Sequence, residues 1–301
     1  MSLDALQEQL KGIDKSEIEL FVSDNASDDN TAEVVQEHIN HGMPITYHRN
    51  SKNLGAAVNF YGCMQWASGK YVYILGDDDV LRSGSVAYIL DILRGKDYGI
   101  VHFLQGQVDD SDCSEIVYTD TDMFLRCISF WITFVSANIF RKDIVKLIDP
   151  EPYKNTHFLQ LPFYVTSALN HPHNLVVRRP IMDVLDFVNN GGYHYHKVFV
   201  QNYLNIWKEF LDKQQIKRST YQFLKRDIYY KHVDEYNYQL LIKHVNVISE
   251  TESYLNTRCG YKVNGAWKIL FKYYGYELYF YKSLLRYIRR YFREKEIYSY
   301  N

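Results

Sequence analysis

The chain has 301 residues, 47% of them hydrophobic, which suffices for one large or two ordinary domains and argues against a disordered protein. Its formal net charge of −2 gives no electrostatic reason to expect a nucleic-acid partner. The four cysteines are scattered without a CxxC pair, which argues against a disulfide framework or zinc site and indicates a cytoplasmic location. Neither a signal peptide nor an apolar run long enough to span a bilayer is visible.

The first hundred residues alternate between helical and strand patterns. Helices are predicted at residues 2–11, 31–41, 53–66 and 85–93, and strands at 18–22, 45–48, 71–75 and 100–104. Asn30 and Glu33 have the spacing of a capping box at the start of the second helix. Such alternation predicts a mostly parallel sheet with helices on its faces.

The rest of the chain is less regular and then becomes helical. Helices are predicted at 121–128 and 157–169, strands at 134–140 and 175–178, and further helices at 198–211, 221–230, 236–248 and 267–292. Pro162 should kink its helix or lie in the first turn. The change of character after the glycine pair at 191–192 predicts two domains, residues 1–192 and 193–301.

Three consecutive carboxylates follow the strand predicted at 71–75. That strand stops at Gly76 and runs into Asp77, Asp78 and Asp79. Open α/β sheets bind ligands outside the carboxyl ends of their strands, and stacked carboxylates favour a divalent cation. The alternative is an acidic turn that only closes the strand, because Asp and Gly are common turn residues.

Two further motifs precede these aspartates. The loop DNASDDNT at 24–31 follows the first predicted strand, and NLGAAVN at 53–59 opens a helix. In order and spacing the three motifs resemble those of glycosyltransferase family 2, over roughly residues 17–185. The resemblance implies the GT-A fold, a Rossmann-like α/β fold with a mostly parallel sheet and helices on both faces, followed here by a C-terminal helical region.

The resemblance also implies an activity and roles for single residues. It implies inverting transfer from a nucleoside diphosphate sugar, with Mg²⁺ or Mn²⁺ neutralising the diphosphate. Asp77 and Asp79 are the expected metal ligands, and Asp24 is expected to accept hydrogen bonds from the base or ribose. For Ser27, Asp29 and Thr31 the favoured reading is structural, that they shape the loop and cap the helix. The residues expected at the nucleotide are Asp24, Asn25, Ser27, Asn53, Asp77 and Asp78.

The usual family base, an Asp in an acidic pair that opens a later helix, has no counterpart. The corresponding stretch at 155–160 reads NTHFLQ and resembles the branch of abequosyltransferase-like enzymes of O-antigen synthesis. His157 is therefore the candidate base, since imidazole titrates in the useful pH range. A histidine that caps or packs its helix is the alternative, and Asp149 and Glu151 are reserve candidates.

His194 and His196 alternate in GGYHYHKV, and in an extended segment both would lie on one face and could reach one ion. His196 is therefore a candidate metal ligand, with a surface loop rich in His and Tyr as the alternative reading.

Both ends of the chain depart from the family pattern. The family's opening strand has no counterpart, so we expect an unfilled slot or a replacement strand in the sheet. The stretch at 267–296 is aromatic and basic, which suits peripheral contact with the inner face of a bacterial membrane and a polyprenyl-linked acceptor. The alternative is a helical cap that packs on the catalytic domain or on a second copy, as in a homodimer.

The sequence thus predicts an inverting glycosyltransferase that acts on a glycan or lipid-linked acceptor in bacterial surface polysaccharide synthesis. A catalytically silent GT-A scaffold is one alternative, because the carboxylate base and first strand are absent. A nucleotidyltransferase is another, although it would need a glycine-rich, basic phosphate loop that this sequence lacks.

Overall fold

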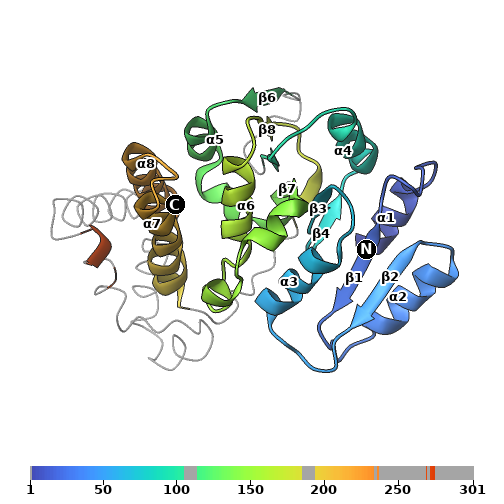
Figure 1. The fold of residues 1–301 in the computed structure, drawn as a ribbon. Helices are drawn as coiled ribbons and strands as arrows, with labels where there is room; N and C mark the ends of the chain where they lie inside the picture. The colour runs from blue at the N-terminus through green and yellow to red at the C-terminus, as the bar shows by residue number, and fades with distance from the viewer. Residues whose placement is uncertain are drawn as a thin grey trace, which may run out of the picture. The chain divides into compact units, whose positions relative to one another are not determined.

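The computed structural model of the chain describes residues 2–104, 114–184, 194–233, 236, 269 and 272–274 (Figure 1). It divides into two compact units, residues 1–186 and 187–301. The division falls close to the domain boundary expected near residue 192, which stays a prediction. The helices predicted at 236–248 and 267–292 lie almost entirely outside the described residues, and so does most of the basic stretch at 267–296.

The first unit alternates short helices and strands, as the sequence predicts (Figure 1). Its helices are α1 (Ser2–Gln9), α2 (Thr31–Asn40), α3 (Ala56–Trp66), α4 (Ser85–Leu93), α5 (Thr121–Ile128) and α6 (Gln160–Leu169). Its strands are β1 (Leu20–Asp24), β2 (Ile45–Arg49), β3 (Tyr71–Tyr73), β4 (Asp79–Leu81), β5 (Ile100–Phe103), β6 (Glu115–Tyr118), β7 (Asn138–Arg141), β8 (Asn174–Val177) and β9 (Met182–Val184).

Two local predictions at helix starts have different outcomes. Pro162 lies in the first turn of α6, where its missing N–H costs nothing. The capping box of Asn30 and Glu33 is wrong, because Asn30 makes no side-chain cap and its φ of −81° and ψ of 17° are not extended. Asp29 serves instead, and its carboxylate accepts the N–H of Thr31 at 3.0 Å.

The central sheet has the strand order β3-β7-β5-β8-β6. Only β5 and β8 pair in parallel within it, whereas β7 lies antiparallel to both β3 and β5, and β6 lies antiparallel to β8. The sheet is therefore mixed rather than mostly parallel. The reversed strands β6 and β7 both come from the less regular middle of the chain, where helix–strand alternation gives no direction.

Strands β1 and β2 form a separate parallel pair, with Leu20 opposite Ile45 and Asp24 opposite Arg49. Among the described residues no ladder joins β1 to β3, so the sheet is interrupted where the sequence led us to expect a slot or a replacement strand. Helix α1 contacts α2, β4 and α4, and the side-chain amide of its Gln9 donates to the Leu81 carbonyl and accepts the Val86 N–H, both at 3.1 Å.

The core lies around β5, β8 and α6. Every residue of β5 and β8 is buried, so both faces of these strands are covered. Helix α6 contacts β5 and β7, and the ring of its Tyr164 meets that of Phe140 edge-on at 5.2 Å. Each fully buried aromatic side chain of this kind contributes about 1.5–3 kcal/mol to folding.

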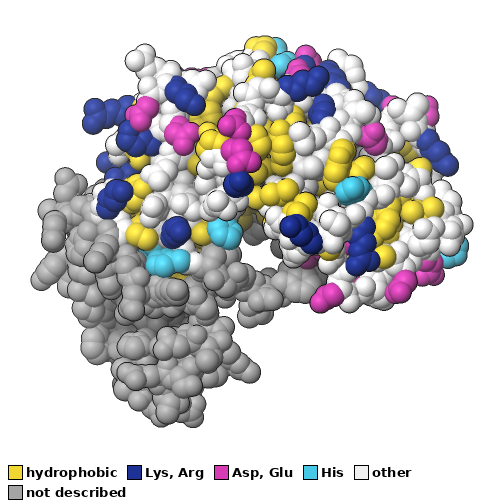
Figure 2. Space-filling model, turned by 60° about the horizontal axis from the view of Figure 1, so that its bottom comes forward, with side chains coloured by type: hydrophobic (Ala, Val, Ile, Leu, Met, Phe, Trp, Pro, Cys, Tyr) yellow, Lys and Arg dark blue, Asp and Glu magenta, His cyan; other side chains and the backbone are white. Residues whose placement is uncertain are grey.

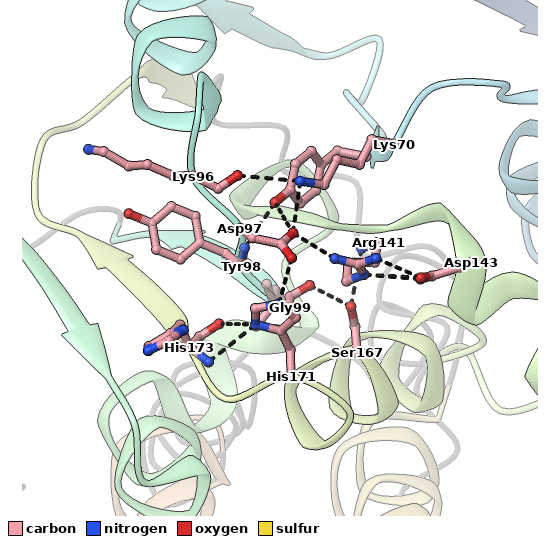
Figure 3. A network of polar contacts seen from close by, with 12 residues as sticks. Lys70, Lys96, Asp97, Tyr98, Gly99, Arg141, Asp143, Ser167, His171 and His173 are labelled. Atoms are coloured by element: carbon pink, nitrogen blue, oxygen red, sulfur yellow. Dashed lines mark hydrogen bonds and ion pairs between the residues drawn. The ribbon is translucent and has the colours of Figure 1, made fainter.

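A polar cluster secures one end of the central sheet (Figure 3). Asp97, before β5, pairs with Lys70 before β3 at 2.8 Å, with Arg141 at the end of β7 at 2.7 Å, and with His171 before β8 at 3.1 Å. Hydrogen bonds from Lys70 and His171, with the charge of Arg141, hold the pKa of Asp97 far below its usual range. We call these four side chains the Asp97 cluster. Lys70 precedes β3 and the aspartates follow it, so the cluster marks the end of β3 remote from the aspartates.

The second unit is helical where it is described. A π-helical turn, η5 (Lys197–Asn202), leads into α7 (Tyr203–Asp212), and α8 (Arg218–Ile228) runs into a second such turn, η6 (Tyr229–Val233). The helices predicted at 198–211 and 221–230 are thus confirmed with shifted ends. Among the residues that the structure describes, none of the helices combines the length and apolar character needed to cross a membrane.

Candidate functional site

A tight turn carries the three aspartates from β3 to β4. The N–H of Asp79 donates to the carbonyl of Gly76 at 3.2 Å, and Asp79 then opens β4 opposite Val184 of β9. This pairing buries Asp79 to 5% exposure, whereas Asp77 and Asp78 stay exposed. The turn therefore presents two accessible carboxylates beside one that is fixed in a strand.

Gly76 allows two of these carboxylates to converge. A Cβ added to Gly76 would lie 2.8 Å from Asp78 Oδ1, 3.0 Å from Asp79 Oδ2 and 3.4 Å from the hydroxyl of Ser136. A side chain at this position would thus displace both carboxylates. Glycine here is explained by close approach rather than by an unusual backbone conformation.

The turn concentrates negative charge. Burial raises the pKa of Asp79, the charges of Asp78 and Asp77 raise it further, and a hydrogen bond from Ser136 acts in the opposite direction. The ion pairs within the described part of the chain involve other carboxylates, such as Asp24 and Asp97. Such a site favours a cation beyond those that the described residues supply.

A divalent cation at this turn would have to share its coordination shell with ligands from outside the described side chains. In the described ranges no three His, Cys, Asp or Glu side chains converge as a closed metal site. Mg²⁺ commonly takes only one or two carboxylates and completes its shell with water and substrate phosphates. Asp78 and Asp79 suit that arrangement, and the expected role of Asp77 as a ligand stays a prediction.

A second group of polar side chains joins the ends of β1 and β2 to the start of α3. The amide of Asn25 donates to Asn53 Oδ1 at 2.9 Å, and its oxygen accepts from Asn50 at 3.1 Å. Asn50 also donates to Asn59 at 3.1 Å, and Asn59 accepts the hydroxyl of Ser23 at 2.6 Å. We call Asn25, Asn50, Asn53 and Asn59 the amide cluster.

Asp24 anchors the loop beside the amide cluster. Only 3% of the residue is exposed, and its carboxylate accepts the Ser27 N–H and the Tyr47 hydroxyl, both at 2.7 Å. Burial acts to raise the pKa of Asp24, but these hydrogen bonds and the charge of Arg49 hold it below its usual value. Ser27 shapes the loop through its N–H, while contact of Asp24 and Ser27 with a nucleotide stays a prediction.

The segment of residues 129–137 connects the aspartates with α6. It consists of two short 3₁₀ helices, η1 (Ser129–Thr133) and η2 (Val135–Ala137), where the sequence led us to expect a strand from residue 134. Ser136 bonds the aspartate turn through the Gly76 N–H at 2.8 Å. The side chain of Gln160 in α6 donates to the Thr133 carbonyl at 2.9 Å. We call residues 129–137 the bridging segment.

His157 lies three residues before α6, exposed and with a φ of 65°. The expected helix from 157 therefore starts late, at Gln160. The two residues that follow, Phe158 and Leu159, are buried and anchor the loop, while the side chain of His157 is exposed. The position suits a base that meets an acceptor, a role that stays a prediction.

His194 and His196 lie in the second unit. The extended segment expected there is wrong, because Tyr195 and His196 already belong to a helical turn, although the two imidazole rings are only 6.1 Å apart. His196 is buried beside Tyr236, with ring centroids 5.6 Å apart. Its role as a metal ligand stays a prediction.

Sequence reasoning missed several residues that the fold brings to this region. Asn50 follows β2 in HRN, and a polar residue at a strand end could have indicated it. Ser136 gives no signal in the sequence, since it contacts Gly76 from 60 positions further along the chain.

Exposed hydrophobic side chains lie beside the amide cluster: Leu54 and Val58, at the start of α3, are 41% and 42% exposed. On the face that Figure 2 shows, hydrophobic side chains likewise gather between charged ones over the described surface.

Comparison with known proteins gives one family and one curated relative. The family described as Glycosyl transferase family 2 matches residues 2–148. Abequosyltransferase RfbV of Salmonella typhimurium is 41% identical in an alignment of 207 residues that covers 59% of this chain and 61% of that protein. The matched part thus spans less than two thirds of this relative.

Solved structures with the same fold include S. aureus TarS and a mannosyltransferase. Residues 1–349 of S. aureus TarS in complex with UDP-GlcNAc align with a TM-score of 0.60 and 16% identity, covering 77% of this chain and 69% of that one. The mannosyltransferase PcManGT of Pyrobaculum calidifontis with GDP-Man and Mn²⁺ aligns with a TM-score of 0.52 and 14% identity, covering 90% and 79%. At such identities these likenesses establish the GT-A fold alone.

Proposed function

We propose, from the match of residues 2–148 to the family described as Glycosyl transferase family 2, that the chain is an inverting glycosyltransferase. Its donor is a nucleoside diphosphate sugar, and its acceptor is a glycan or a polyprenyl-linked glycan of bacterial surface polysaccharide synthesis. The likeness to a relative named abequosyltransferase supports sugar transfer as the reaction.

The observation that carries the proposal is the aspartate turn. In the turn that follows β3, the carboxylates of Asp78 and Asp79 converge over Gly76. Among the described residues, no Lys or Arg forms an ion pair with them. A bound Mg²⁺ or Mn²⁺ would there neutralise the charge of the leaving diphosphate. The Mn²⁺ of the PcManGT complex supports the use of a divalent metal.

Nucleotide binding and proton transfer are the other two roles that the reaction requires. Asn25 and Asn53 of the amide cluster offer donors and acceptors for the nucleotide. His157 accepts the proton of the attacking acceptor hydroxyl, whose oxygen forms the new bond to the anomeric carbon. The bond from that carbon to the diphosphate breaks, and the leaving group takes the electron pair. Attack from the face opposite the diphosphate inverts the configuration.

The kind of acceptor determines where in the cell the enzyme would work. A polyprenyl-linked acceptor would bring the enzyme to the inner face of the bacterial membrane from the cytoplasm. The basic stretch at 267–296 would then contact anionic lipid, and its packing on a second copy is the alternative use of the same residues.

Calorimetric titration with UDP, GDP, CDP and dTDP tests the proposal, each in Mn²⁺ and in EDTA. We expect one nucleotide to bind tightly only with metal, and Asp79→Asn to abolish that binding because it removes a charged ligand. Asp91→Asn, an exposed aspartate of α4, is the matched control and should bind as the unchanged chain does. Failure of all four nucleotides to bind would contradict the proposal and favour a silent scaffold.

A further inference from the structure

Ser136 contacts the aspartate turn although it lies 60 residues further along the chain. Its Oγ accepts the Gly76 N–H at 2.8 Å, and its backbone carbonyl accepts the hydroxyl of Tyr73, the last residue of β3, at 2.9 Å. The residue is fully buried, so water does not compete for these bonds. The turn and the bridging segment are therefore fixed to each other at two points.

The hydroxyl of Ser136 has one proton to donate. Because its oxygen already accepts the Gly76 N–H, the proton is available to the carboxylate of Asp79, whose Oδ2 lies 3.0 Å from the point above Gly76 that is 3.4 Å from Ser136 Oγ. A hydrogen bond to a charged acceptor is roughly twice as strong as one between neutral groups. A bond from this hydroxyl would restrict the rotation of the Asp79 carboxylate.

Such a restraint is needed because the carboxylates repel each other. Oxygens of Asp78 and Asp79 lie 2.8 and 3.0 Å from the same point above Gly76. Without a bound cation, like charges this close favour rotamers that separate them. A donor beside Asp79 opposes that separation before any ion arrives.

The bridging segment holds Ser136 in place. Asn138, at the start of β7, donates through its side chain to the carbonyls of Ile132 at 3.1 Å and Phe134 at 2.6 Å. Its oxygen faces Nδ1 of the buried His102 at 2.8 Å. The backbone on the N-terminal side of Ser136 is therefore tied to the central sheet.

We propose that Ser136 is a positioning residue whose hydroxyl holds the carboxylate of Asp79 in the orientation in which it shares one divalent cation with Asp78. The proposal rests on the proposed function, because it assumes a cation at the aspartate turn. Outer partners of metal ligands act in this way in other sites, where their loss weakens metal binding by about 10–100-fold.

Titration of the full chain with Mn²⁺ alone, followed by electron paramagnetic resonance, tests the proposal. Ser136→Ala should raise the Kd for Mn²⁺ about tenfold. Ser136→Thr retains the hydroxyl and should restore the Kd to within about threefold of its original value. Ser167→Ala is the matched control, since Ser167 is also fully buried and donates to a carbonyl, that of Gly99, in the Asp97 region.

The outcomes separate this proposal from the proposed function. Unchanged Mn²⁺ affinity in Ser136→Ala would overturn the positioning role while leaving the metal site intact. An equal loss in Ser167→Ala would also overturn it, because general destabilisation would then explain the effect. Absence of Mn²⁺ binding by the unchanged chain, both alone and with each of the four nucleotides, would overturn both proposals.

Discussion

Two non-glycine residues with left-handed backbone lie in the loops of the candidate site. Ala26, with a φ of 61°, sits between Asp24 and Ser27, and His157 has a φ of 65°. Each such conformation costs about 1–3 kcal/mol and persists where its surroundings determine it. Thr156 supplies such a restraint beside His157, since its hydroxyl donates to the Tyr153 carbonyl and accepts the Phe158 N–H.

The left-handed backbone of His157 determines the variant that tests its role. His157→Asn removes the imidazole while keeping a residue that adopts this conformation readily. We expect kcat for hydrolysis of the bound nucleotide sugar to fall about 10²–10⁴-fold, with nucleotide affinity unchanged, because the general base is lost. Initial rates and calorimetry measure the two quantities.

His41→Asn provides the comparison, as His41 is an exposed histidine at the end of α2. An unchanged kcat in His157→Asn would assign the proton transfer elsewhere, with Asp149 and Glu151 as the next candidates.

At the scale of elements, the bridging segment depends on one buried side chain. The amide of Asn138 donates to the carbonyls of Ile132 and Phe134, so its oxygen must accept, and His102 carries its proton on Nδ1. Burial lowers the pKa of His102 to about 4, which keeps the imidazole neutral near pH 7. In the bridging segment, side-chain hydrogen bonds from Asn138 thus take the place of the backbone hydrogen bonds that a regular strand would make.

Asn138→Ala should therefore destabilise the chain by about 3 kcal/mol, because it removes a donor from each of the Ile132 and Phe134 carbonyls and the acceptor of the buried His102 Nδ1–H. The free energy of unfolding in urea measures the loss. Asn170→Ala removes an exposed amide that donates to the Thr166 carbonyl at 2.9 Å, and should cost about 0.5 kcal/mol or less. Equal losses in the two variants would contradict the anchoring role of Asn138.

At the scale of the molecule, the Asp97 cluster joins segments before β3, β5 and β8 with the end of β7 (Figure 3). The pKa of Asp97 is lowered in the folded chain, so its charge favours folding above its unfolded pKa of about 3.9. That contribution is lost as the pH falls below this value. Half of the Asp97 side chain is exposed, so solvent screens the interactions and the contribution is about 1 kcal/mol.

Asp97→Asn should lower the free energy of unfolding by about 1 kcal/mol at pH 7, and the difference should shrink toward pH 3 and in 1 M NaCl. Urea unfolding at the two pH values and two salt concentrations measures it. Asp143→Asn is the control, because Asp143 pairs with Arg141 alone among the described residues. A difference that persists at pH 3 would contradict an ionic origin.

The sequence by itself predicted the resemblance to glycosyltransferase family 2, the GT-A fold and the two loops of the candidate site. Asp77, Asp78 and Asp79 are contiguous, and Asn25 and Asn53 lie in short motifs at strand ends. Most helices were also predictable, since their apolar periodicity is local: α4 and α5 have the predicted bounds.

Only the tertiary structure decided the strand directions and the partners of the aspartates. Strand β7 runs antiparallel between β3 and β5, and the bridging segment before it brings Ser136 to Gly76. The amide cluster likewise joins Asn25 to Asn50 and Asn53 from separate loops. These contacts depend on how buried strands pair and how buried polar groups find partners, and neither leaves a periodic pattern along the chain.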